Sequence, residues 1–257
     1  MRILNRAALV IDGLVNRVLV VAIVIILLVS GYSYWDNLYL YRSAQDTSLL
    51  TYKPVLDKPL LIYDEAVSDK TASGAATSGD RMEFVTGLPG QVGWISLYNT
   101  NVDYPIMQGA NNFEYLNKDP YGAFKLSGSI FLDFRSDSLL QDPYSVIYGH
   151  HMEHGSMFGS LEDYLDRAYF DAHRNGRITT GDAVYQLTLF AVTSADGNDR
   201  TFFDPEGRTR EEILDYLVRN AIFFESPQEG LNLVALTTCY GEEYISRLAV
   251  VGTIQKL

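Results

Sequence analysis

One uninterrupted apolar run near the N-terminus constrains this chain more than any other feature. Residues 18–35 read VLVVAIVIILLVSGYSYW, and the first fourteen of them carry no charge. Such a stretch is long enough to cross a bilayer as a helix. Tyr32, Tyr34 and Trp35 would then lie at the interface, where amphipathic rings prefer to be. The run therefore predicts one membrane-spanning helix.

The charges around this run predict its orientation. Arg2, Arg6 and Arg17 precede it, whereas Asp36 follows it. The positive-inside rule then places the N-terminus in the cytoplasm and the rest of the chain outside. A cleaved signal peptide is the alternative, but its apolar core is shorter and ends at small residues, where this chain has large aromatic ones. We expect a retained single-pass anchor in the cell membrane.

The remaining residues divide by their composition. Residues 68–80 read SDKTASGAATSGD, and small polar residues of this kind predict a flexible linker because they bury too little apolar surface to become ordered. We therefore expect a cytoplasmic N-terminus and anchor over 1–35, an extracytoplasmic stalk or linker with a possible helix over 36–80, and a folded domain over 81–257. The net charge is −12, and no basic patch is present for a nucleic-acid partner.

Short runs of Val, Ile, Tyr, Phe and Thr, separated by turn residues, fill the chain after about residue 81. This composition is typical of strands, and several short strands predict a sandwich or a barrel. The expected strands are 93–98, 129–134, 145–148, 176–180, 183–193, 232–238 and 244–253.

Two helices are expected between these strands, a short one over 157–167 and a longer one over 209–224. Thr209 can cap the longer helix, and Glu212 completes a capping box. Apolar residues then repeat at helical spacing as far as Ile222. The pattern predicts an amphipathic helix of about four turns, packed against the sheet.

The only cysteine, Cys239, follows the expected strand 232–238. Extracellular cysteines usually pair, so a single one is an inert buried thiol, half of an intermolecular disulfide, or a nucleophile. A nucleophilic thiol needs a base, and His150 follows Gly149 at the end of another strand, where it can face a cleft. Arg247 lies within an apolar strand, where a charge needs an anion or a cleft, and it can stabilise an oxyanion.

Other interpretations of these residues stay open. A metal site could be formed by His150, His151 and His154. Adjacent histidines on an extended chain project in opposite directions, however, and no H-E-x-x-H pattern is present, so we expect no metal and no cofactor. Arg247 could also have a structural role, paired with Glu242, Glu243 or Asp133.

Several motifs together resemble the sortase family. LTTC at 236–239, with Arg247 eight residues after the cysteine, resembles its T-L-x-T-C signature and downstream arginine, with Ala235 replacing the usual threonine. YGHHMEHGSMFG at 148–159 is similar to the histidine segment of class B sortases. Three segments between residues 92 and 133 resemble the start of the class B catalytic domain: VGWISLYNTNVDYPIMQG, NNFEYLNKD and GSIFLD. The resemblance covers about residues 81–257.

This resemblance implies a mainly β fold, a closed eight-stranded sortase-type barrel with peripheral helices that follows an N-terminal transmembrane helix. By position, Cys239 corresponds to the nucleophile, His150 to the catalytic histidine, Arg247 to the catalytic arginine, and Thr238 to a threonine lining the substrate groove. The implied catalytic domain is 81–257.

The activity implied by the resemblance is that of a cysteine transpeptidase. It would cleave an LPxTG-like or NPxTx-like sorting signal near the C-terminus of secreted proteins through a thioacyl-enzyme. An amine of a peptidoglycan precursor or a pilin lysine would then accept the protein, and the sequence does not distinguish wall anchoring from pilus polymerisation. Two other functions fit the same residues: a cysteine hydrolase that uses water as acceptor, and a non-enzymatic, membrane-tethered binding domain.

Overall fold

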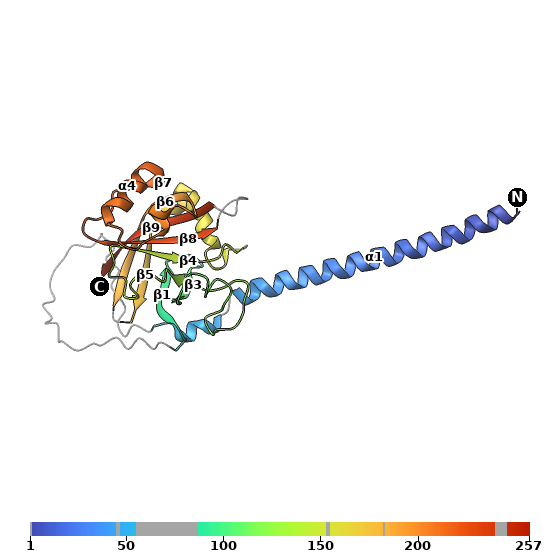
Figure 1. Cartoon of the computed structure of the whole chain (residues 1–257), viewed down its shortest axis with the longest axis horizontal. Coiled ribbons are helices and arrows are strands. Elements are labelled where there is room, and N and C mark those ends of the chain that lie inside the picture. Colours follow the sequence, from blue (N-terminus) through green and yellow to red (C-terminus); the bar gives the residue numbers. More distant parts are fainter. Residues whose placement is uncertain (1, 45–46, 55–86, 153–154, 182, 240–245) are drawn as a thin grey trace, which may run out of the picture. The chain divides into compact units, whose positions relative to one another are not determined.

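We describe a computed structural model that covers residues 2–44, 47–54, 87–152, 155–181, 183–239 and 246–257, with the backbone alone at 2–12, 40–44 and 239 (Figure 1). The chain forms two compact units, Met1–Ala44 and Gln45–Leu257. The linker predicted at 68–80 and the boundary predicted at residue 81 lie outside the described residues.

The first unit is one helix, α1 (Arg2–Ala44). Its apolar segment runs from Gly13 to Tyr39, and none of its side chains there is buried. Twenty-seven residues of helix extend about 40 Å, which exceeds the roughly 30 Å hydrocarbon core of a bilayer. By length and composition the segment is a candidate membrane span, and the helix extends beyond residues 18–35 at both ends.

Eight strands of the second unit close into a barrel, as the resemblance implied. Their order is β5-β1-β2-β3-β4-β8-β9-β6, and β6 pairs back with β5. Neighbours are antiparallel except β2–β3 and β4–β8, which are parallel. The strands are β1 (Gln91–Leu97), β2 (Asp103–Met107), β3 (Ile130–Leu132), β4 (Tyr144–Tyr148), β5 (Asn175–Thr180), β6 (Val184–Asp196), β8 (Asn232–Cys239) and β9 (Ser246–Lys256).

Two strands were not predicted. β2 contains Pro105, which disrupts the sequence pattern of a strand because proline lacks an N–H to donate. The other is β7 (Ala221–Phe224), which pairs with β6 outside the closed ring. The remaining seven lie within a few residues of their expected positions.

The long helix was predicted correctly at its start and wrongly at its end. α4 (Arg210–Asn220) begins with the expected capping box between Thr209 and Glu212. It ends at Asn220, and the next residues form β7 instead of a further turn. Ile222, Phe223 and Phe224 favour strands, and β7 gains ladder bonds to the free edge of β6.

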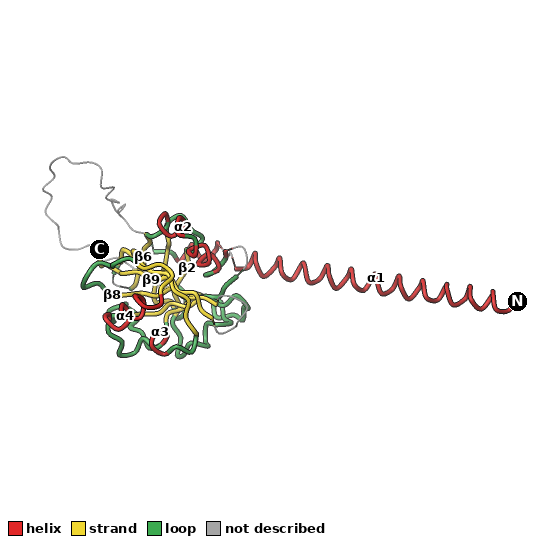
Figure 2. Tube along the Cα trace, turned by 90° about the horizontal axis from the view of Figure 1, so that it is seen from above, coloured by secondary structure: helices red, strands yellow, loops and turns green. Residues whose placement is uncertain are grey.

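Smaller helices surround the barrel. The helix expected over 157–167 is a 3₁₀ helix, η3 (Gly159–Leu165), followed by α2 (Arg167–Ala172). α3 (Arg200–Phe203) was not predicted, and the 3₁₀ helix η1 (Thr47–Tyr52) lies within 36–80, where a possible helix was expected. Figure 2 shows the strands gathered at the centre of this unit, with α2, α3 and α4 at its periphery.

Candidate functional site

The parallel pairing of β4 with β8 aligns two of the predicted site residues. Every pair in this ladder, from Tyr144–Leu233 to Tyr148–Thr237, is separated by 89 positions (237 − 148). The last of these pairs is closed by the Gly149 N–H, which donates to the Thr237 carbonyl over 3.1 Å. His150 and Cys239 have the same separation (239 − 150), so they lie two positions beyond the last pair in the same register.

The antiparallel pairing of β8 with β9 adds the third residue. Cys239 lies directly opposite Arg247 in this ladder. Positions 150, 239 and 247 therefore meet at one end of three neighbouring strand paths, β4, β8 and β9. Residues directly opposite in an antiparallel pair lie close enough for their side chains to interact.

A pocket of about 330 Å³ opens at this end of the barrel. Among the predicted site residues His150, Thr238 and Arg247 line it. Other parts of its wall come from the β2–β3 loop, the residues after β3, the end of β4 and α3. These contribute Asn112, Phe113, Leu116, Arg135, Tyr148 and Phe203.

The hydrogen bond of His150 assigns roles to its two ring nitrogens. Its Nε2 lies 2.7 Å from the backbone carbonyl oxygen of Leu116. A carbonyl only accepts, so Nε2 must carry the proton of the neutral ring. Nδ1 is then the basic nitrogen, available to take a proton from a thiol.

The two adjacent histidines diverge, as the sequence predicts. The Nε2 of His151 lies 3.0 Å from Oε2 of Glu162, and this pair lines a separate pocket with Asn101 and Ser160. His154 lies outside the described residues, as do Glu242 and Glu243.

The two threonines before the cysteine differ in their contacts. The Thr237 hydroxyl donates to the Leu248 carbonyl over 3.1 Å, which ties β8 to β9. Thr238 is buried, and within the described residues its hydroxyl has no hydrogen-bond partner. Its side-chain oxygen therefore retains both donor and acceptor capacity beside the pocket.

A buried carboxylate that the sequence did not single out for the site organises its wall. Asp133 is fully buried directly after β3. Its Oδ2 accepts hydrogen bonds from Asn112 over 2.8 Å and from the Tyr148 hydroxyl over 3.1 Å. Arg135 binds both of its oxygens, with Nε at 2.9 Å and Nη2 at 2.8 Å. Asp133 thus contacts three residues that line the pocket.

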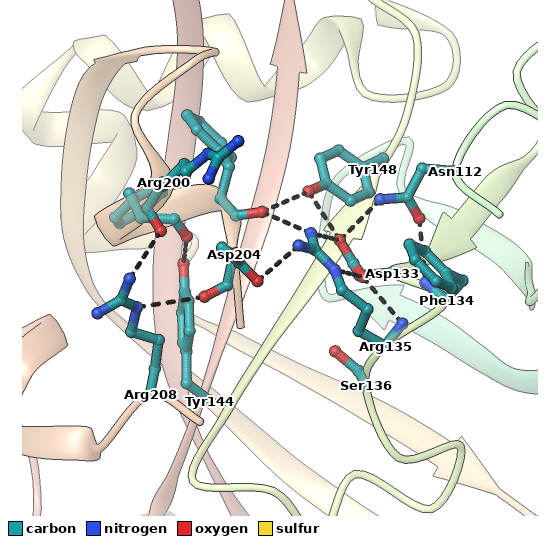
Figure 3. Close-up of polar contacts among 12 residues, drawn as sticks. Asn112, Asp133, Phe134, Arg135, Ser136, Tyr144, Tyr148, Arg200, Asp204 and Arg208 are labelled. Carbon is teal, nitrogen blue, oxygen red and sulfur yellow. Dashed lines mark hydrogen bonds and ion pairs between the residues drawn. The ribbon is translucent and has the colours of Figure 1, made fainter. Parts of the chain in front are cut away.

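Arg135 links this carboxylate to α3. Its Nη1 donates to Asp204 Oδ1 over 2.5 Å, and its Nη2 also donates to the Phe203 carbonyl over 2.9 Å. Figure 3 shows the guanidinium between Asp133 and Asp204, with Tyr148 and Asn112 on the far side of Asp133. The network therefore joins four parts of the wall that are far apart in sequence.

The network also sets the charge of its members. Burial alone would raise the pKa of Asp133, but hydrogen bonds from Arg135 and Asn112 outweigh it and hold that pKa below its usual range. Burial and the neighbouring Asp133 carboxylate raise the pKa of Tyr148 well above its usual value. Asp133 is therefore an anion and Tyr148 a neutral donor at neutral pH.

Asp133, one of the three acids considered as a partner of Arg247, thus already has other partners. Asp133 has Arg135, Asn112 and Tyr148 as its partners. The D-F-R sequence of 133–135, directly after an apolar strand, is the signal that would have pointed to a local carboxylate–guanidinium pair.

Comparison with known proteins agrees with this fold. A model of the Sortase domain family matches residues 95–255. Sortase B of Staphylococcus aureus is 32% identical over 173 residues, which are 65% of this chain and 70% of that protein.

Solved structures give the same result. A Streptococcus pyogenes class B sortase involved in pilus biogenesis aligns with a TM-score of 0.60 and 32% identity, over 65% of this chain and 92% of its own. A Staphylococcus aureus sortase B–substrate complex aligns with a TM-score of 0.60 and 29% identity, over 65% of this chain and 81% of its own. The chain therefore belongs to the sortase family, and within it to the class B sortases.

Proposed function

We propose that this class B transpeptidase uses Cys239, His150 and Arg247 to move secreted proteins from a C-terminal sorting signal onto an amine. The observation that supports this assignment best is the strand register. Extending the β4–β8 register by two residues aligns position 150 with position 239, and position 247 is opposite position 239 in the β8–β9 ladder. Chemistry by a lone thiol needs a base and an oxyanion stabiliser within reach, and these are the residue types at the two neighbouring positions.

The first step of the proposed reaction is acylation. The Cys239 thiolate attacks the carbonyl of the residue that precedes the scissile bond, a threonine in an LPxTG-like or NPxTx-like signal. Arg247 stabilises the oxyanion, as a fixed guanidinium does most effectively in a site that excludes water. His150 gives a proton to the departing amine, which leaves a thioacyl-enzyme.

The second step transfers the acyl group. An acceptor amine attacks the thioester carbonyl, and His150 takes the proton that the amine loses. The thiolate is then released and the new amide bond is complete. We propose a cell-wall precursor or a pilin lysine as the source of this amine, and Thr238 as a residue lining the groove that holds the signal.

A matched pair of variants tests the assignment. Cys239→Ala should abolish cleavage of both an LPxTG and an NPxTx peptide, and Cys239→Ser should retain folding with little turnover. Acid quenching of the wild-type reaction, followed by mass spectrometry, should place the acyl adduct on Cys239, and hydroxylamine should release that adduct as a hydroxamate and restore the free thiol. Cleavage that survives in Cys239→Ala would refute the assignment.

The two other functions predict different results. A hydrolase would release free acid whether or not an amine is added, whereas a transpeptidase would form amide in proportion to acceptor concentration. A binding domain would carry a thiol that does not react with an alkylating probe at neutral pH. Product analysis with triglycine, with a lysine-containing pilin peptide and without an amine separates these cases.

We further propose that α1 is a retained anchor with its N-terminus in the cytoplasm. The apolar segment Gly13–Tyr39 supports this because its length exceeds what a bilayer requires. Protease treatment of intact cells should digest the barrel, and mass spectrometry should recover residues 1–35 with the membrane. Loss of these residues from the mature protein would indicate a cleaved signal peptide.

A further inference from the structure

The segment that directly follows α1 is fixed to the barrel. α1 ends at Ala44 and η1 begins at Thr47, so only two residues separate them. Leu49 of η1 is buried in a cluster with Trp94 and Met107. This contact belongs to the barrel unit itself and shows that the chain joins the barrel almost as soon as α1 ends.

Polar contacts reinforce this attachment. Lys53 donates to both carboxylate oxygens of Asp103 over 2.8 and 2.7 Å. The Ser48 hydroxyl lies 2.9 Å from the hydroxyl of Tyr121 in the β2–β3 loop. The ring of Tyr52 also meets the ring of Tyr121 edge-on, with centroids 6.0 Å apart. The β2–β3 loop is therefore held against η1.

Chain geometry limits how far this loop lies from the membrane, if α1 spans it as proposed above. Residues 40–44 rise about 7.5 Å as helix, and three Cα–Cα steps from residue 44 to residue 47 span at most about 11 Å. At most about 20 Å of chain thus separates η1 from the end of the apolar segment. The headgroup layer of a bilayer accounts for about 5–7 Å of this length.

The surface of this same loop is unusually apolar. Phe113 is 80% exposed and Phe124 is 77% exposed, and Tyr121 and Leu126 are also exposed. Leu50 of η1, the helix that contacts this loop through Ser48 and Tyr52, is also exposed. Large apolar side chains gathered in one exposed loop mark an interaction surface.

The charge of the loop fits a lipid surface. Between residues 109 and 128 two lysines balance two acidic residues, although the whole chain has a net charge of −12. The loop is therefore not repelled by anionic headgroups as the rest of the protein is. Aromatic and leucine side chains beside lysine are the residue types that enter the membrane interface.

We propose that the β2–β3 loop, through Tyr121, Phe124 and Leu126, docks on the outer surface of the membrane that α1 spans. The same loop supplies Asn112, Phe113 and Leu116 to the wall of the site pocket. Docking therefore holds one wall of the pocket at the membrane, where a sorting signal still tethered by its own apolar segment would arrive.

The proposal is tested by measuring how strongly nitroxide-labelled lipids quench a fluorophore attached at one position of the loop. In the full chain carrying Cys239→Ala, a single cysteine introduced by Ala123→Cys is labelled with an environment-sensitive dye. Ala123 is exposed in the loop, and its replacement leaves the aromatic residues intact. The chain is reconstituted in phosphatidylethanolamine–phosphatidylglycerol vesicles with and without headgroup-region nitroxide lipids.

The matched control is Val218→Cys, at an exposed position of α4. The helix α4 lies at the top of the barrel in Figure 1, whereas η1 lies at its lower edge. We expect about a twofold loss of fluorescence at position 123 and little loss at position 218. Adding Phe124→Ser and Leu126→Ser should remove most of the quenching at 123, whereas Ile222→Ser on β7 should not.

Equal quenching at positions 123 and 218 would overturn the proposal. Shielding of position 123 from both lipid nitroxide and aqueous iodide would also overturn it, because residues 55–86 or another protein copy would then cover the loop. If the chain does not float with the vesicles, the proposed anchor fails instead, so the two failures are distinguishable. Because the assay uses Cys239→Ala, its result is independent of the proposed catalytic roles.

Discussion

Replacing Asp133 by asparagine is the sharpest test of how the site wall is built. Asparagine has nearly the same shape, so the change removes the charge without opening a cavity. Asp133 is fully buried and accepts hydrogen bonds from Arg135, Asn112 and Tyr148. After the change, an NH₂ group replaces one of the two acceptor oxygens. This group is itself a donor, so it cannot accept the hydrogen bonds that the oxygen accepted.

The expected loss of stability follows from the burial of the two partners. Removing one member of a buried ion pair costs about 3–5 kcal/mol because the other charge is left uncompensated. Here Arg135 is 21% exposed and keeps its bond to Asp204, which lowers the expected cost to about 2–3 kcal/mol. For a domain of this size the melting temperature should fall by about 5–10 °C.

The pH dependence of stability gives an independent check on the sign of the contribution of Asp133. The pKa of Asp133 is lower in the folded protein than its ordinary value. Its contribution to stability is therefore fully present above the unfolded pKa of about 3.9 and disappears as pH falls through the folded pKa. The difference between wild type and Asp133→Asn should be constant from neutral pH down to about 5 and shrink below about 4.

Thermal unfolding of the full chain in detergent, followed by near-ultraviolet circular dichroism at several pH values, measures this difference. Asp204→Asn is the matched control, because it contacts the same guanidinium but is 33% exposed, and partly exposed pairs contribute only about 0–1 kcal/mol. The reasoning is refuted if Asp133→Asn melts with the wild type, if both variants lose the same stability, or if the difference persists at pH 3.

Three further changes probe the chemistry and the frame. Arg247→Lys should lower kcat about 100-fold or more with little change in KM, measured by peptide cleavage, because a lysine cannot reproduce the donor fork of the guanidinium; an unchanged kcat would contradict its role. Thr209→Ala should lower the free energy of unfolding by about 1 kcal/mol in urea titration, whereas Thr209→Ser should not, because the cap accepts from Glu212. Gly149→Ala would place its Cβ 2.7 Å from the Phe158 ring, so we expect about 1–3 kcal/mol of destabilisation by calorimetry together with slower turnover. Full activity in this variant would show that the approach of Gly149 does not position the neighbouring histidine.

The strands that carry the candidate site residues could be predicted because they have a strong composition signal, and each of these residues lies at or just beyond a strand end. β4 and β8 are buried almost throughout. Parallel strands that are covered on both faces have nearly continuous apolar sequences. The ends of these runs identify Gly149–His150 and Cys239, and Arg247 stands out as the charge within another such run. What the sequence alone could not provide was which strands are neighbours.

The failures share a different physical cause. Ala221 and Ile222 continue the helical spacing of α4, but strand pairing with β6 outweighs this local pattern. Asp133 appeared only as one of several acids near Arg247. Its role depends on Arg135 reaching Asp204, 69 positions further along the chain, and no periodicity in the sequence encodes such a contact.

The strand register explains why the alignment of positions 239 and 247 is robust once the barrel forms. From Leu233 to Thr238 every side chain of β8 is buried, so a slip of one residue would exchange its two faces against differently shaped neighbours. β8 is also paired along its length on both sides, with β4 and with β9. A slip would have to break both ladders, and it would move position 239 out of line with His150 and Arg247 at once. The core that stabilises the barrel therefore also fixes the alignment on which the proposed chemistry depends.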